Sequence, residues 1–123
     1  MDIQTTKKRF DNVLILSIDC IKAITMKQLF TIINALQFGK AYIYAYYEED
    51  FLYIATLYTH PQYRGLKYAS TLLNRAKYEA KKNKCKMIKL MDHTDYFNQE
   101  NNIYLKHGFQ YMDKGQPEMY YII

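Results

Sequence analysis

The chain has 123 residues, enough for one domain with a single modest core. Half of its residues are hydrophobic, which is a globular composition, and 14 are tyrosines, which pack a ring while keeping a polar tip. With 17 Lys and Arg against 12 Asp and Glu, the formal charge of +5 fits an anionic ligand or partner. It does not choose among a nucleotide cofactor, nucleic acid and an acidic protein.

Three features of the sequence argue against a metal site, a disulfide, a membrane span and a signal peptide. Cys20 and Cys85 are the only cysteines and lack metal-site spacing, so we expect two reduced core cysteines and no metal. No apolar run approaches the roughly 20 residues of a membrane-spanning helix. The short run Val13–Ile18 is poorly flanked for a signal peptide, so we expect a cytoplasmic domain without a membrane role.

The N-terminal third predicts one strand and one helix. Met1–Asn12 is polar and carries no predicted element, whereas Val13–Ile18 (VLILSI) predicts a buried strand. Thr25–Gln28 has the form of a capping box, and the apolar stripe that follows it predicts a helix over Met26–Gln37. Gly39 stands where a helix C-terminal glycine belongs.

The middle of the chain predicts a hairpin followed by a β–α–β unit. Ala41–Tyr47 and Phe51–Thr59 are rich in aromatic and β-branched residues and flank a short acidic link, which favours an antiparallel hairpin. An apolar stripe then predicts a helix over Tyr68–Asn83, and Cys85–Met91 predicts a strand parallel to Phe51–Thr59. The inward side chains of this last strand are expected to be Cys85, Met87 and either Ile88 or Leu90.

The C-terminal part predicts a short helix and a closing strand pair. The helix covers Asn98–His107, is capped by Asn98 or Asp95 and stops at Gly108. Phe109–Met112 and Glu118–Ile122 predict two antiparallel strands. The whole order predicts one α/β domain over residues 1–123, with a mixed, mostly antiparallel sheet, one parallel pair and helices on both faces.

The loop from Gln62 to Tyr68 is the strongest functional signal. It joins a strand to a helix N-terminus, where unpaired N–H groups and the helix dipole can hold phosphate. Gly65 permits a tight turn, and Arg64 and Lys67 add positive charge. Taken alone, a glycine in such a loop is more often only a turn.

Two motifs give the loop a family resemblance. Leu57–Leu73 resembles motif A of the GNAT superfamily of acyl-CoA-dependent N-acetyltransferases, an apolar strand, a proline-containing turn and Q/R-x-x-G-x-G/A opening a helix. Gln62-x-x-Gly65 fits that pattern, and Tyr104–Phe109 (YLKHGF) looks like the family's Y-x-K-x-G-F motif, with His107 expected at the surface. The resemblance is close over Phe51–Ile123 and general over residues 1–50, where we find one strand fewer than the family usually has.

One position departs from the pattern. Lys67 stands where the motif has its second small residue. Its side chain could crowd the cofactor's pyrophosphate, or it could swing outward and pair with the phosphates as a point charge. The intact Arg64-Gly65 pair and the second motif favour the outward arrangement.

The resemblance implies a parallel strand pair splayed for CoA, and transfer of an acetyl group from acetyl-CoA to a primary amine of a small molecule or protein. Tyr104 would protonate the departing thiolate, and a backbone N–H of Phe51–Thr59 would stabilise the oxyanion. The implied cofactor-binding residues are Leu57, Tyr58 and Thr59 for the pantetheine arm, the N–H groups of Gln62, Tyr63, Arg64, Gly65, Leu66, Lys67, Tyr68 and Ala69 for the pyrophosphate, and Asn98 or Asn101 on the other side of the pantetheine, next to Tyr104.

The general base is not evident, because Phe51–Thr59 lacks the glutamate that family members often carry there. The candidates are Glu48, Glu49, Asp50, His60, Asp92 and His93, and a water relay without a dedicated base is also open.

Two other functions compete with acetyl transfer. The first is a CoA-binding or regulatory module of the same fold that has lost catalysis. The second is a basic nucleic-acid-binding domain, which is disfavoured because no stacking pattern or known reader motif accompanies the lysines. Both a monomer and a homodimer fit the sequence.

Overall fold

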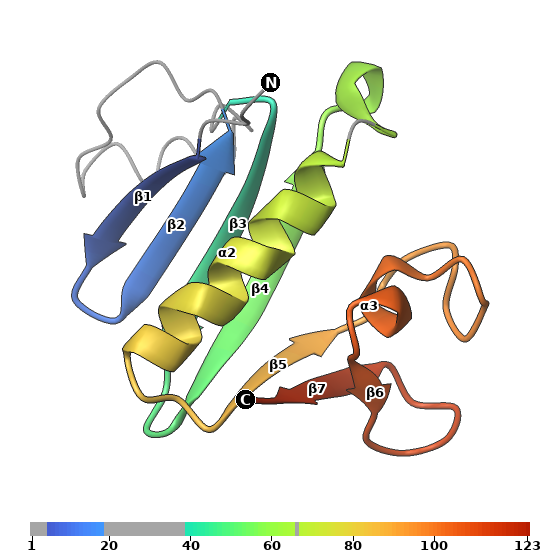
Figure 1. Ribbon diagram of the computed structural model, residues 1–123. Coiled ribbons are helices and arrows are strands. Elements are labelled where there is room, and N and C mark those ends of the chain that lie inside the picture. The colour runs from blue at the N-terminus through green and yellow to red at the C-terminus, as the bar shows by residue number, and fades with distance from the viewer. Residues whose placement is uncertain (1–4, 19–38, 66) are drawn as a thin grey trace.

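The computed structural model describes residues 5–18, 39–65 and 67–123. The described residues form one sheet of seven strands in the order β1-β2-β3-β4-β5-β7-β6 (Figure 1). The elements are β1 (Thr5–Phe10), β2 (Val13–Ile18), β3 (Ala41–Tyr47), β4 (Phe51–Thr59), the 3-10 turn η1 (Pro61–Tyr63), α2 (Tyr68–Lys82), β5 (Met87–Met91), α3 (Ile103–Lys106), β6 (Gln110–Tyr111) and β7 (Glu118–Ile122). The helix predicted over Met26–Gln37 and Cys20 lie outside the described residues.

The sheet is mixed, as predicted. Five of its neighbouring strand pairs are antiparallel, including the hairpin of β3 and β4, and β4 pairs with β5 in parallel. The helix α2 connects those two parallel strands, which confirms the β–α–β unit. Within the described residues, no helix is long and apolar enough to cross a membrane.

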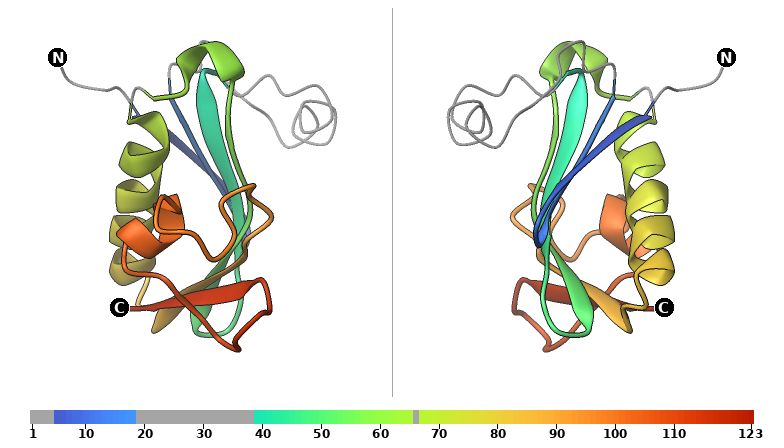
Figure 2. Two further views of the ribbon diagram at one scale, coloured as in Figure 1. Left: turned by 90° about the vertical axis from the view of Figure 1, so that its right-hand side faces the viewer. Right: turned by 90° about the vertical axis from the view of Figure 1, so that its left-hand side faces the viewer.

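The main core lies between the sheet and α2. The apolar stripe of α2, including Leu72 and Leu73, is fully buried against alternate residues of the strands, such as Leu16 and Ile43. Tyr104 of α3 belongs to the same core, and both described helices lie on one face of the sheet (Figure 2). Burying side chains of this size contributes about 1.5–3 kcal/mol each.

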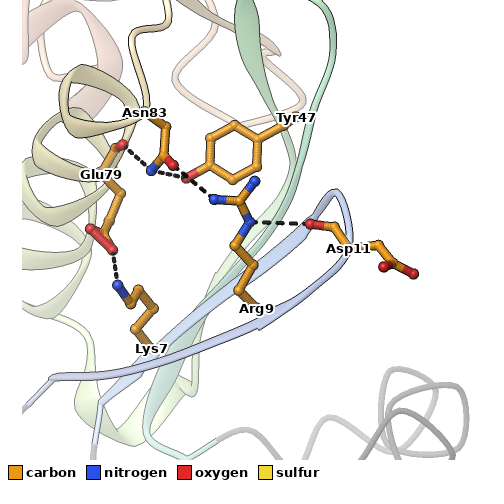
Figure 3. A network of polar contacts seen from close by, with 6 residues as sticks. All are labelled: Lys7, Arg9, Asp11, Tyr47, Glu79 and Asn83. Carbon is orange, nitrogen blue, oxygen red and sulfur yellow. Dashed lines mark hydrogen bonds and ion pairs between the residues drawn. The ribbon is translucent and has the colours of Figure 1, made fainter.

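The strand β1 is a difference from the sequence prediction, which placed no element in residues 1–12. Thr5–Phe10 pairs with β2 along its whole length and forms one edge of the sheet. Two of its basic side chains reach across to α2 (Figure 3). Lys7 Nζ lies 2.8 Å from Glu79 Oε1, and Arg9 Nη1 donates to Asn83 Oδ1 at 2.7 Å. Since these contacts are polar, the strand leaves no alternating apolar pattern in the sequence.

The strand β5 corrects the predicted facing of its residues. Ile88 and Leu90 are both buried in the main core, whereas Met87 is half-buried and, by strand alternation, lies on the opposite face. Cys85 is buried, but it precedes the strand. The alternation of buried and half-buried side chains therefore starts at Met87, where β5 begins, and does not include Cys85.

The helix α3 is shorter than predicted. It starts at Ile103 rather than Asn98, and its N-cap is Asn102 rather than Asn98 or Asp95. Asn98 has a φ of 59°, which a right-handed helix does not contain. The closing pair of β6 and β7 is antiparallel as predicted, with β6 reduced to two residues.

Candidate functional site

The parallel strands separate at one end of the sheet. β4 pairs with β5 only from Phe51 to Ile54, although β4 continues to Thr59. At the same place the register between β3 and β4 shifts, so Ala55 has no partner on β3 and is exposed together with Thr56. Beyond Ile54, the β5-facing edge of β4 is therefore not paired with β5.

A cavity of about 560 Å³ lies in this opening, within the usual size of a small-molecule site. Four parts of the chain meet there: the end of β4, the loop and first turn of α2, the segment after β5, and α3. The lining residues are Leu57, Tyr58, Thr59, Tyr63, Arg64, Gly65, Lys67, Tyr68, Ala69, Ser70, His93, Thr94, Asp95, Tyr96, Asn101, Ile103 and Tyr104.

The loop before α2 contains two residues in left-handed backbone conformations. Gly65 has a φ of 82°, and a Cβ placed there would meet nothing within 4 Å, so a ligand can approach this backbone. Lys67 has a φ of 66° at the N-cap of α2, a conformation that favours glycine. The motif Q/R-x-x-G-x-G/A can also be aligned two residues later, on Arg64, Lys67 and Ala69, and this leaves Lys67 as its single departure.

Arg64 links this loop to the end of β4. Its Nε donates to the Thr59 carbonyl at 3.1 Å. Within the part of the chain that the structure describes, its Nη groups have no partner, and Lys67 is exposed on the same cavity wall. Two cations and the N-terminus of a 15-residue helix therefore face this end of the cavity, which suits an anionic group.

Tyr104 contributes the opposite wall. Its side chain is only 7% exposed, and its ring packs edge-on against Phe109 with centroids 6.0 Å apart. Burial, and then the negative charge of Asp92, raise the pKa of Tyr104 to about 12. The hydroxyl therefore keeps its proton across the neutral range, and no described residue accepts a hydrogen bond from it.

His107 differs from its predicted place at the surface. It is half-buried at the end of α3, and its Nε2 lies 2.7 Å from Ser70 Oγ in the first turn of α2. Burial and the nearby Lys77 cation lower the pKa of His107, which favours the neutral ring. This contact joins the two helices that line the cavity.

The structure separates the candidates for the general base. The acidic hairpin tip lies at the far end of the sheet, where Asp50 pairs with Lys86 just before β5. His60 packs against Tyr58 outside the lining, and Asp92 is buried with both carboxylate oxygens hydrogen-bonded. His93 alone among these candidates lines the cavity.

Most of the predicted cofactor residues lie together at the cavity, with three exceptions. Gln62 and Asn98 are exposed and lie off its lining, and Leu66 is outside the described residues. The lining residues that sequence reasoning missed are Ser70, Thr94, Asp95, Tyr96 and Ile103. Residues 94–96 belong to no motif, so only their position after β5 could have indicated them.

No cluster of three or more metal-ligating side chains occurs among the residues that the structure describes. The polar groups on the cavity lining are hydroxyls, an imidazole, a guanidinium, an ammonium, a carboxylate and a carboxamide, together with the backbone.

Comparison with known proteins identifies relatives of this fold. The family model for the acetyltransferase (GNAT) domain matches residues 27–111. No curated protein sequence matches the chain significantly.

Solved structures share the fold at low sequence identity. A PaiA N-acetyltransferase from Thermoplasma acidophilum in complex with coenzyme A is 20% identical with a TM-score of 0.62, over 91% of this chain and 62% of that one. A GNAT-family acetyltransferase from Staphylococcus aureus Mu50 is 14% identical with a TM-score of 0.63, over 89% and 67%. The NatC complex bound to Gag peptide and CoA is 16% identical with a TM-score of 0.62, over 90% of this chain and 70% of that one. The chain thus spans about two thirds of the length of these relatives.

Proposed function

Because the chain belongs to the GNAT family of acetyltransferases, we propose that it moves the acetyl group of acetyl-CoA directly to a primary amine of a small molecule or a protein. The observation that carries this proposal is the cavity between the separating strands β4 and β5. There the loop before α2 faces Tyr104 of α3.

The residues present fit CoA. The cavity has the volume of a small-molecule site, its loop end carries Arg64 and Lys67, and the backbone at Gly65 is open to a ligand. In this proposal, the N–H groups between Tyr63 and Ala69 hold the pyrophosphate. The edge of β4 at Leu57–Thr59 and the side chain of Asn101 hold the pantetheine arm from two sides.

Acetyl-CoA would supply the acetyl group as a thioester, so that a C–N bond forms as the C–S bond breaks. The chain must then provide a proton for the departing sulfur and remove one from the amine. Tyr104 suits the first task, because its hydroxyl is protonated and the residue lines the cavity. We assign the second task to His93, the base candidate on the cavity wall.

Two measurements test this proposal. Acetyl-CoA at about 100 times its Kd is expected to stabilise the protein by about 2.7 kcal/mol in a thermal melt. Thiol release should then depend on an added amine, in a panel that includes small diamines, lysine peptides and peptides with free N-termini. The peptides belong in it because a NatC structure holds a Gag peptide.

The outcomes separate the competing functions. Absence of stabilisation by both CoA and acetyl-CoA would contradict any CoA-dependent role. Binding without thiol release for every amine would instead support a CoA-binding module. Loss of activity in His93→Ala with CoA binding retained would support His93 as the base, and an unchanged rate would favour a water relay.

A further inference from the structure

Asp92 is a buried carboxylate that the proposed chemistry does not use. It follows β5 directly and is 2% exposed. Its Oδ1 accepts hydrogen bonds from the Thr94 amide at 2.9 Å and the Thr94 hydroxyl at 2.6 Å. Its Oδ2 accepts from Asn102 Nδ2 and from the Tyr111 hydroxyl, both at 2.5 Å. We call these four residues the Asp92 cluster.

The charge of Asp92 is stable in this setting. Burial by itself would raise its pKa, but the hydrogen bonds from Thr94, Tyr111 and Asn102 together lower the pKa below its usual value. A buried carboxylate with four donors is fully satisfied. The cluster is therefore held together by an ionised acceptor at neutral pH.

Asn102 connects the cluster to the helix that carries Tyr104. Its amide nitrogen donates to Asp92 and to the Tyr96 carbonyl, the latter at 3.1 Å. Its Oδ1 is thereby turned toward α3, where it accepts from the N–H of Tyr104 at 2.8 Å and of Leu105 at 3.3 Å. The backbone amide of the proposed catalytic residue is thus held directly by this side chain.

The side-chain amide of an asparagine cap has an oxygen, which accepts hydrogen bonds, and an NH₂ group, which only donates them. The carboxylate of Asp92 accepts from the NH₂ group of Asn102, so it fixes the orientation in which the Asn102 oxygen points to α3. Because α3 has only four residues, this cap is a large share of the bonding that holds it. The Tyr111 hydroxyl also accepts from the Asn98 amide at 2.9 Å, which ties the preceding loop to the cluster.

We propose that Asp92 is a positioning residue for acyl transfer, which orients Asn102 and thereby sets the place of the Tyr104 hydroxyl at the cavity. This inference rests on the proposed function. It assigns Asp92 no contact with substrate, since both of its oxygens are occupied within the cluster.

The first test is Asp92→Asn. Whichever way its amide turned, an asparagine at 92 would face its NH₂ against a donor, the Thr94 N–H on one side or the Asn102 NH₂ on the other. We expect kcat to fall by on the order of 10²-fold, because misplacing a catalytic group by about 1 Å costs that much. The Kd for CoA should change less than about threefold, since the loop before α2 is outside the cluster.

A double-mutant cycle tests the route through Asn102. A serine at 102 can cap the helix with its hydroxyl, which has no amide group whose orientation Asp92 must fix. Asp92→Asn should therefore lower kcat by less than about threefold in the Asn102→Ser background, against about 10²-fold in the wild type. An equal loss in both backgrounds would overturn the proposed route.

Two further measurements keep the test independent of stability and of turnover. Glu79→Gln changes the other buried carboxylate among the described residues, which pairs with Lys7 away from the cavity, and should lower stability without lowering kcat. Amide hydrogen exchange at Tyr104 and Leu105 should accelerate in Asp92→Asn, whether or not the protein turns over substrate.

If Asp92→Asn does not fold, Tyr111→Phe is the second variant. It removes one of the four hydrogen bonds to the Asp92 carboxylate and should lower kcat and accelerate the exchange by less than Asp92→Asn would.

The outcomes separate this inference from the proposed function. A wild type without acyl transfer contradicts the function, and an unaffected Tyr104→Phe removes Tyr104 from the mechanism. An active enzyme that depends on Tyr104 but keeps its kcat and its Tyr104 amide protection in Asp92→Asn overturns the positioning role alone.

Discussion

Tyr104 is a buried residue that also lines the cavity. Replacing it with phenylalanine keeps the ring in its contact with Phe109 and removes only the proton donor. We expect Tyr104→Phe to lower kcat by about 10²-fold with little change in the Kd for CoA. Steady-state kinetics and a CoA titration measure the two effects.

The raised pKa of Tyr104 adds a second expectation. Because its pKa is about 12, the hydroxyl should produce no fall in kcat below about pH 11. Tyr78→Phe is the matched control, since this tyrosine is 54% exposed on α2 and lies off the cavity lining. Equal rates for wild type and Tyr104→Phe would remove Tyr104 from the mechanism.

Lys67 is held in a left-handed conformation at the N-cap of α2, so its backbone and its charge can be tested separately. Lys67→Gly relieves the conformational strain and should raise the free energy of unfolding by up to about 1 kcal/mol. Lys67→Asn removes the charge but keeps a residue that tolerates this conformation. Both variants should weaken CoA binding by about two- to fivefold, the worth of one exposed ion pair. Tighter binding in both would show that Lys67 crowds the site.

The positions of the two motifs at the cavity could be predicted from the sequence because each is a local pattern that resembles a family motif. Gly65 and Tyr104 lie where the resemblance implied, at the cavity. Thr94 and Tyr96 reach the same cavity only because β5 ends beside the separated part of β4. That juxtaposition depends on tertiary packing, and no local pattern around residues 94–96 encodes it.

At the scale of elements, β1 is held to α2 by polar contacts. Glu79 is fully buried, its Oε1 meets Lys7 Nζ, and its Oε2 has no hydrogen-bond donor among the residues described. Arg9 lies 4.3 Å above the Tyr47 ring and bonds Asn83 (Figure 3). An edge strand with these charges also resists pairing with other chains.

Removing one partner of the Lys7–Glu79 ion pair should lower the free energy of unfolding more than removing both. Lys7→Ala leaves the Glu79 carboxylate buried without a cation, and we expect it to lower the free energy of unfolding by about 1–3 kcal/mol. The double variant Lys7→Met/Glu79→Leu should be near neutral or stabilising, because apolar groups need no desolvation. Urea unfolding measures both. A single variant no less stable than the double one would contradict this account.

The same contacts explain why β1 could not be predicted, whereas β2, β3 and β4 could. Those strands have β-branched and aromatic residues that face a core, and their predicted bounds agree with the structure. The charged side chains of β1 predict a solvated segment, because the sequence does not show that Glu79 of α2 lies next to Lys7. Similarly, the turn at Asn98 and the cap at Asn102 depend on Asp92 and Tyr111, which a helix pattern alone does not include.

At the scale of the molecule, the proposed site draws on most of the fold. Its walls come from β4, the first turn of α2, the segment after β5 and α3, all joined to the main core that the sheet shares. A ligand bound there touches elements that are far apart in the sequence, so it should stabilise the chain as a unit rather than one segment of it.

This coupling makes the proposal of one domain testable. We expect a single cooperative unfolding transition, with equal calorimetric and van't Hoff enthalpies. CoA at about 100 times its Kd should move the whole transition by on the order of 10 °C, which follows from about 2.7 kcal/mol in a chain of this size. The β1 contacts with α2 should melt in the same transition, because α2 supplies both the cavity wall and Glu79. A second transition that CoA leaves in place would instead divide the chain into separately folding parts.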